Sequence, residues 1–305
     1  MYEAGFLYGI PHRFPYREAR DGYWGEQTST LNWCEEDYNF THYIAEFVNT
    51  FSNLIFMWLG AKGIWNCVTY GHSRVLTFGF IGYIIVGLGS MAFHATLKYS
   101  MQLADELPMI YTTCIMGFAT FAYGKGRMFR LWLGSALAGL AAFITIYYHI
   151  TKNPVFHQVA YASLMIALVV RGYFVTKGEM EPALRRRSPL KADKIMGQMN
   201  ALVLTGVSLF LIGFALWNLD NIYCHHLISW RSRILLPWSI VLEGHSWWHL
   251  FTGLGAYNLI VWRILLETCL NGKENDFMLQ RTTFLAVPEV VPVSEQAGIA
   301  NKKRV

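Results

Sequence analysis

Apolar residues gather along the chain in seven long runs, which are separated by polar stretches. Each run approaches the roughly 20 residues that a helix needs to cross a lipid bilayer. One run has no Asp, Glu, Lys or Arg from Leu131 to Thr151, and another has none from Ile195 to Leu219. The runs predict seven membrane-spanning helices, at residues 43–66, 75–95, 103–124, 129–150, 154–174, 197–219 and 240–263. No stretch has an alternating pattern that predicts a strand.

The composition agrees with this pattern. The chain of 305 residues is 54% hydrophobic and only 15% charged, whereas soluble domains carry about 25% charged residues. The predicted fold class is therefore an all-α membrane protein, a seven-transmembrane helix bundle. The formal net charge of +5 is explained by basic loops on one side of the membrane, so it does not indicate a nucleic-acid partner.

The distribution of Lys and Arg predicts the orientation of the bundle. The start of the chain lacks the apolar segment of a cleavable signal peptide, so we expect the first helix to direct insertion. If the N-terminus is lumenal, 18 of the 25 Lys and Arg residues fall on the cytosolic side. That bias is the one that the positive-inside rule requires. The sequence thus predicts a lumenal N-terminus and a cytosolic C-terminus.

This topology divides the chain into three regions. Residues 1–42 form a lumenal N-terminal segment, residues 43–263 the transmembrane domain, and residues 264–305 a cytosolic tail that is partly disordered. The tail closes on a Lys-Lys-Arg cluster at residues 302–304, which either serves as an endoplasmic-reticulum retrieval signal or only keeps the tail soluble. We expect a multi-pass protein of the endoplasmic reticulum or Golgi membrane.

Three histidines stand within or beside the apolar runs. His245 and His249 are four residues apart, which places both rings on one face of a helix. His94 closes the second run, and the predicted topology puts all three on the lumenal side. Ionisable groups at membrane depth are costly and usually functional. Three neutral imidazoles would leave the fourth position of a tetrahedral zinc ion open, so the pattern predicts a catalytic zinc site.

Two further polar residues lie near these histidines. Ser90 precedes His94 by one helical turn and could face a developing oxyanion, although serine also simply allows close helix packing. Asp105 could act as a general base, or it could be an interfacial carboxylate in the first turn of the third helix. His149 and His157 we interpret as packing or hydrogen-bonding residues.

Oxygen-bearing side chains gather before and within the first predicted helix, at Asn32, Glu35, Asp37 and Glu46. Such ligands suit a hard cation such as calcium. The alternative is a solvated acidic turn without a metal.

The five cysteines fall into two groups. Cys67, Cys114 and Cys269 are predicted to be buried or reduced thiols. Cys34 and Cys224 both fall on the lumenal side, where a disulfide is permitted. The residues alone leave open whether these two pair or remain free.

Several sequence blocks, in the same order, resemble the alkaline ceramidases. They are YWGEQTSTLNWCEEDY (23–38), YIAEFVNTFSNLI (43–55), GSMAFHATLKYSMQLADELPMIY (89–111), PVFHQV (154–159), FALWNLDNIYC (214–224) and HSWWHLFTGLGAY (245–257). The resemblance covers most of the chain, from about Gly22 to Trp262.

The resemblance implies a seven-helix intramembrane zinc hydrolase, in a wider group that includes adiponectin-receptor-like proteins. Such enzymes cleave ceramides, taken from the bilayer, to a sphingoid base and a free fatty acid. The implied residues are the zinc ligands His94, His245 and His249, the catalytic Asp105 and Ser90, the calcium ligands Asn32, Trp33 (through its carbonyl), Glu35, Asp37 and Glu46, and a Cys34–Cys224 disulfide. Asn32 stands where animal members have Asp, and Asp37 where they have Asn. The exchange keeps the total charge, so we expect the calcium site to survive.

Two other functions compete with this one. A related lipid hydrolase, such as an enzyme that remodels glycolipid anchors, would share the zinc site but cleave an ester. A seven-helix receptor or transporter would use zinc only structurally. A structural site is usually closed by a fourth ligand, and Ser90 and Asp105 beside the histidines argue for an open one unless Asp105 is itself that ligand.

Overall fold

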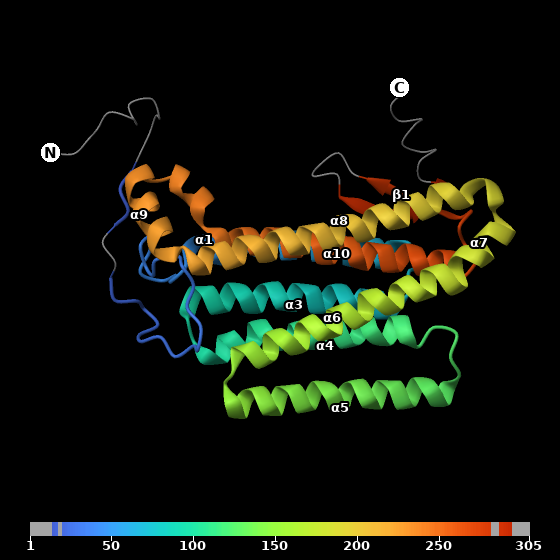
Figure 1. The fold of residues 1–305 in the computed structure, drawn as a ribbon, viewed down its shortest axis with the longest axis horizontal. Coiled ribbons are helices and arrows are strands. Elements are labelled where there is room, and N and C mark those ends of the chain that lie inside the picture. The colour runs from blue at the N-terminus through green and yellow to red at the C-terminus, as the bar shows by residue number, and fades with distance from the viewer. Residues whose placement is uncertain (1–13, 18–19, 282–286, 295–305) are drawn as a thin grey trace, which may run out of the picture.

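The computed structural model describes residues 14–17, 20–281 and 287–294 of the chain and is mostly helical (Figure 1). The helical elements are α1 (Phe47–Ser52), α2 (Leu54–Thr69), α3 (Arg74–Thr96), α4 (Tyr99–Phe121), α5 (Arg127–Thr151), α6 (Pro154–Val175), η1 (Thr176–Met180), α7 (Glu181–Arg187), α8 (Pro189–Ile222), α9 (Cys224–Ile234), η2 (Trp238–Leu242) and α10 (Gly244–Leu270).

Five of the described helical segments are long and apolar enough to cross a membrane. They are α3, α5, α6 with its continuation to Arg187, α8 and α10. The other two predicted runs correspond to α1 with α2, which is interrupted at Asn53, and to α4, which carries Asp105 and Glu106. The prediction of a helical membrane protein is thus confirmed in outline, whereas the count of seven spanning helices stays a prediction.

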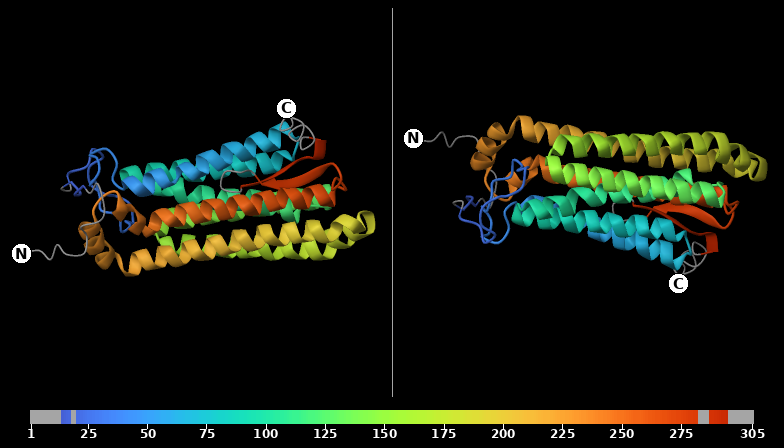
Figure 2. Two further views of the ribbon diagram at one scale, coloured as in Figure 1. Left: turned by 90° about the horizontal axis from the view of Figure 1, so that it is seen from above. Right: turned by 90° about the horizontal axis from the view of Figure 1, so that it is seen from below.

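The long helices lie side by side (Figure 1), and seen from above α10 lies between α2 and α8 (Figure 2). It packs against α8 most extensively and also against α2 and α3. A Cβ atom on Gly255 would lie 2.9 Å from the carbonyl oxygen of Gly206, so glycine at this crossing lets α8 and α10 approach closely. By contrast, α5 exposes large apolar side chains such as Leu131 and Ile150, as a lipid-facing helix does.

Some helix boundaries follow from local chemistry. The Asn153 side chain accepts a hydrogen bond from the backbone N–H of Val155 at 3.0 Å, and Pro154 occupies the first turn of α6. Both residues favour a helix start. α8 also begins with a proline, Pro189. It therefore starts eight residues before the predicted span at 197–219.

The chain after α10 differs from the sequence-based prediction. Helix α10 continues to Leu270, beyond the predicted span. Strands β1 (Phe277–Arg281) and β2 (Pro288–Pro292) then form an antiparallel pair with Leu279 opposite Val290. The prediction that the chain has no strand is wrong here, because the buried Val290 packs on the bundle and its carbonyl accepts a hydrogen bond from Asn66 of α2 at 3.1 Å.

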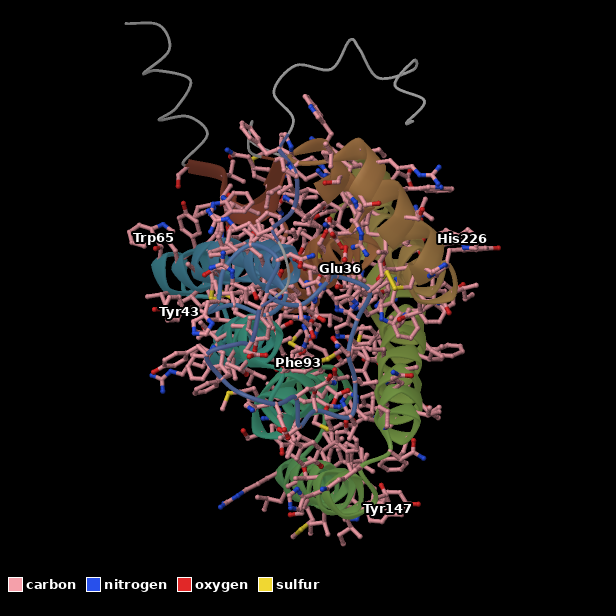
Figure 3. All side chains as sticks on the ribbon, turned by 90° about the vertical axis from the view of Figure 1, so that its left-hand side faces the viewer. Glu36, Tyr43, Trp65, Phe93, Tyr147 and His226 are labelled. Carbon is pink, nitrogen blue, oxygen red and sulfur yellow. A yellow bond between two sulfur atoms is a disulfide. The ribbon has the colours of Figure 1, made fainter. Side chains whose placement is uncertain are left out.

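The opposite end of the bundle is covered by the segment before α1 and by α9. Figure 3 looks onto this end, with Glu36 on the N-terminal segment and His226 on α9. The disulfide Cys34–Cys224 joins the two parts, with the Cα atoms 5.3 Å apart. This pairing agrees with the one implied by the family resemblance, and Cys67, Cys114 and Cys269 are buried free thiols.

Candidate metal centre and acidic site

The three predicted zinc ligands meet at the covered end of the bundle. His245 and His249 lie on one face of the first turns of α10, and His94 lies in the last turn of α3. One nitrogen from each ring can be chosen so that all three lie within 4.8 Å of one another. All three rings are buried. Helices far apart in the sequence thus bring together three imidazoles that could hold one metal ion.

Two of these rings make polar contacts on the side that faces away from the centre of the triad. His94 Nδ1 pairs with the carboxylate of Glu46, and Ser52 Oγ lies 2.7 Å from His249 Nδ1. In both rings this contact leaves Nε2 for the centre of the triad. Metal-binding histidines characteristically use one nitrogen for the metal and the other for such an outer partner.

Two buried ring nitrogens are not satisfied by the protein. His94 Nε2 and His245 Nδ1 have no hydrogen-bond partner. Buried polar atoms without partners are rare and need an explanation. Three neutral nitrogen donors around one point fit zinc, which binds imidazole readily.

Ser90 and Asp105 line the same centre. A Cβ on Gly89 would lie 1.9 Å from the carbonyl oxygen of Ala104, so the glycine allows α3 and α4 to touch here. The Ser90 side chain lies near the half-buried carboxylate of Asp105. Ser90 Oγ also lies 3.5 Å from His249 Nε2. The site therefore combines a hydroxyl and a carboxylate with the three imidazoles.

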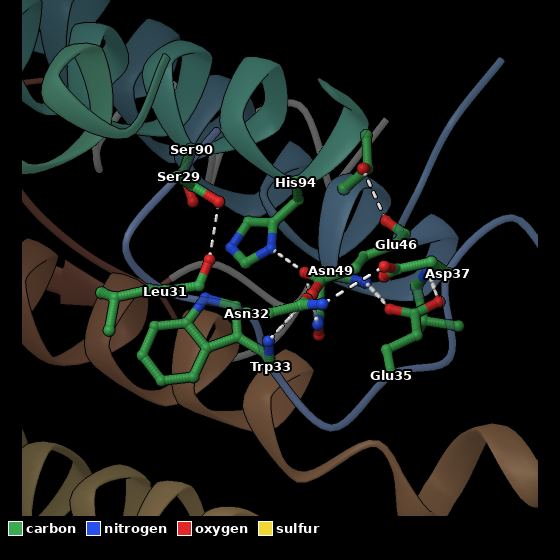
Figure 4. Close-up of polar contacts among 12 residues, drawn as sticks. Ser29, Leu31, Asn32, Trp33, Glu35, Asp37, Glu46, Asn49, Ser90 and His94 are labelled. Carbon is green, nitrogen blue, oxygen red and sulfur yellow. Dashed lines mark hydrogen bonds and ion pairs between the residues drawn. The ribbon is translucent and has the colours of Figure 1, made fainter. Parts of the chain in front are cut away.

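Trp33 covers the centre from the N-terminal segment. Its indole ring stacks on His245, with the ring centroids 4.2 Å apart and the planes inclined by 17°. Its backbone N–H donates to Glu46 Oε1 at 3.1 Å. Figure 4 shows Trp33, His94 and Glu46 close together. The segment before α1 is thus part of the wall of the histidine site.

The predicted calcium residues also lie together, next to the histidines. The Glu35 carboxylate accepts hydrogen bonds from the backbone N–H groups of Val48 and Asn49, at 2.7 and 2.8 Å. Asn32 Nδ2 donates to Asp37 Oδ2 at 3.2 Å, while the buried Asp37 Oδ1 has no partner.

The buried acids lie close enough to influence one another. Burial, and then the neighbouring carboxylate of Glu46, raise the pKa of Glu35. Burial also raises the pKa of Asp37. A bound cation would stabilise the charged form of each carboxylate.

Sequence reasoning missed the residues behind the metal centre. Ser52 and Asn53 contact His249 Nδ1, and Arg231 is buried against Cys34. None has a sequence signal of its own, because a single polar residue beside a helix does not reveal its partner. His157, interpreted as structural, hydrogen-bonds the Glu106 carbonyl through Nε2 at 2.9 Å.

Comparison with known proteins places this arrangement in a family. The protein-family model for ceramidase matches residues 25–291. The chain belongs to the alkaline ceramidase family. The match includes every residue of the histidine and acidic sites and extends into β2, beyond the sequence blocks that first indicated the family.

Individual family members align over most of their length. The chain is 38% identical to alkaline ceramidase 3 of Mus musculus over 256 residues, which are 82% of this chain and 88% of the mouse protein. It is 35% identical to an alkaline ceramidase of Saccharomyces cerevisiae, over 82% of this chain and 80% of the yeast protein. An alkaline ceramidase of Arabidopsis thaliana is 26% identical, over 77% and 82% of the two chains. Membership thus extends across animal, fungal and plant ceramidases.

Proposed function

We propose that this protein is an alkaline ceramidase that uses zinc to hydrolyse the N-acyl amide bond of ceramides. The products are a sphingoid base and a free fatty acid. The family match supports the substrate class. The observation that carries the mechanism is the buried histidine triad, which has unsatisfied ring nitrogens and is lined by Ser90 and Asp105.

The proposed enzyme works within the bilayer. All seven helical runs would span the membrane of the endoplasmic reticulum or Golgi, with the histidine site on the lumenal side and the C-terminus in the cytosol. Ceramide would enter from the surrounding lipid. Its amide could then reach the triad while its chains remain among the apolar side chains of the bundle.

The zinc would be held by His94, His245 and His249. When bound there, it would polarise the amide carbonyl and lower the pKa of the attacking water toward neutral pH. The contacts of Glu46 with His94 and of Ser52 with His249 would fix the ring orientations.

Asp105 and Ser90 would carry out the remaining steps. Asp105 takes the proton from the attacking water as the new carbon–oxygen bond forms. The Ser90 hydroxyl donates a hydrogen bond to the carbonyl oxygen as negative charge develops on it. When the carbon–nitrogen bond breaks, Asp105 returns the proton to the departing amine. The hydroxyl group of the water thus ends in the fatty acid, and its other proton ends on the amine of the sphingoid base.

We also propose that calcium binds the acidic segment, residues 32–37, together with Glu46. The ligands would be Asn32, the Trp33 carbonyl, Glu35, Asp37 and Glu46. The burial of Glu35 and Glu46, with the partly buried Asp37 nearby, supports a cation there, because buried like charges destabilise one another. Glu46 would connect the two metal sites, since its Oε1 accepts from Trp33 and its Oε2 pairs with His94.

The test is fatty-acid release from a panel of ceramides and ester lipids by purified protein in detergent. We expect release from at least one ceramide and none from the ester lipids. His245→Ala should abolish release, while His225→Ala, on the exposed face of α9, should leave it unchanged. Hydrolysis of esters alone would favour the anchor-remodelling class. No hydrolysis by protein that holds zinc would favour a receptor.

A further inference from the structure

Arg231 is the largest side chain that is fully buried in the described part of the chain. It lies in α9, at the end of the bundle that holds the histidines. A buried guanidinium is costly unless charged and polar partners surround it. Its Nη1 pairs with the Glu243 carboxylate, and its Nη2 donates to the Cys34 carbonyl at 2.5 Å. One side chain therefore joins two segments that are otherwise distant in the sequence.

Those two segments each lead directly to one of the proposed metal sites. Cys34 lies between Trp33 and Glu35, in the acidic segment. Glu243 immediately precedes the first residue of α10, and His245 follows two residues later. Any shift of Cys34 or Glu243 would therefore move a proposed calcium ligand or a proposed zinc ligand.

Neighbouring contacts fix the position of Arg231 itself. The disulfide Cys34–Cys224 attaches the first residue of α9 to the acidic segment. Glu243 is also buried, and its carbonyl accepts a hydrogen bond from Ser246 Oγ at 2.7 Å in the first turn of α10. The Arg231 charge acts on Glu35 as well as on Glu243. Arg231 is thus enclosed by a disulfide-linked segment and two buried acidic side chains.

We infer that Arg231 is a positioning residue for ceramide hydrolysis, because its guanidinium fixes the acidic segment relative to the start of α10. Arginine suits this role because its planar group donates in two directions at once, whereas lysine presents a single point charge. Arg231 need not touch the substrate. The inference rests on the proposed zinc and calcium sites, and those sites are tested separately by the zinc content of the wild type and by its rate after calcium removal.

The first test variant is Arg231→Lys, which keeps the charge beside Glu243 but cannot also reach the Cys34 carbonyl. We expect a folded protein that retains zinc, with kcat lowered at least about tenfold, because small displacements of catalytic groups reduce rates strongly. KM should change less than kcat. Arg233→Lys, at an exposed position of the same helix, should behave as wild type. A wild-type kcat for Arg231→Lys would overturn the inference.

The second variant, Arg231→Met combined with Glu243→Leu, distinguishes an effect on the position of the site from an effect on the stability of the fold. Replacing a buried ion pair by apolar residues of similar size is often neutral for stability, so the thermal midpoint should stay near that of wild type. We expect kcat to remain at least about tenfold low, because the link to Cys34 is gone. Full activity in this double variant would refute the positioning role. Failure of both variants to fold would refute it too, since Arg231 would then be required for folding.

Discussion

The two ends of the helix bundle differ in the buried polar groups that they gather. At the hairpin end, which comprises β1, β2 and the turn after α10, charged groups find partners within the protein. Arg187 donates to Glu274 at 3.1 Å, and Lys62 pairs with Glu289. At the histidine end, which comprises the triad and the acidic segment, His94 Nε2 and other buried polar atoms have no protein partner. Asn66 Oδ1, beside the hairpin, also has no partner, but the three described side chains that could together hold a metal ion gather at the histidine end. We therefore interpret the first end as held together by its polar contacts and the second as prepared for a metal.

The largest effect should come from Asp105, because it is proposed to move the proton. Asp105→Asn keeps the size and the contact with Ser90 but cannot act as a base. We expect ceramide hydrolysis to fall at least about 100-fold, the usual contribution of general acid–base catalysis. Zinc content and thermal midpoint should not change. Asp193→Asn, an exposed acid on α8, is the matched control, and normal rates in Asp105→Asn would show that the carboxylate is not the base.

The link between the two metal sites should give the next largest effect. Glu46→Gln removes the charge that pairs with His94 and one proposed calcium ligand. We expect zinc affinity to fall about 10–100-fold, as for other outer partners of metal-binding histidines, measured by competition with a zinc chelator. Glu36→Gln changes a neighbouring acid outside both proposed sites. Equal zinc affinity in the two variants would show that Glu46 does not support zinc binding.

Removal of calcium tests the acidic segment without mutation. A chelator that takes calcium but leaves zinc should lower the rate of ceramide hydrolysis about tenfold, since the wall of the histidine site would loosen. Added calcium should restore the rate. Unchanged hydrolysis, in protein shown to have lost calcium and kept zinc, would mean that the acidic segment does not support catalysis.

The smallest effect on activity is expected at the hairpin end. Glu274→Gln weakens the hydrogen bonds that the buried carboxylate accepts from Arg187 and Ser188, both at 3.1 Å. We expect unfolding to become easier by about 1–3 kcal/mol, measured by thermal or denaturant unfolding, with normal kcat for the folded protein. Glu179→Gln, at an exposed acid, should change stability by less than about 0.5 kcal/mol. A loss of kcat in Glu274→Gln would contradict the division between the two ends.

The sequence predicted the helices well because long apolar runs have few alternatives in a membrane. Backbone polar groups must be satisfied within each segment there, so the predicted runs appear as helices, although the first is broken into α1 and α2 at Asn53. The hairpin was missed because Phe277–Arg281 becomes a strand only through its partner around Val290 and the bundle beneath them. Strand pairing of this kind depends on tertiary contacts that a single sequence does not show.

The site was predictable where residues share a helix and not where they meet through the fold. His245 and His249 are one turn apart, so their common face could be read directly. The predicted topology brought His94 to the same side, and in the structure the three histidines lie together. Ser52 and Arg231 act through residues far along the chain, and no local pattern marks them. The family resemblance, rather than spacing, supplied Trp33 and the disulfide pairing.

The most direct test of the account is the zinc content of the purified protein, measured by elemental analysis beside ceramide hydrolysis. We predict about one zinc per chain in wild type and in His225→Ala, and a loss of both zinc and activity in His245→Ala. Active wild-type protein without zinc, or full zinc content in His245→Ala, would contradict the claim that the buried histidine triad is the metal centre.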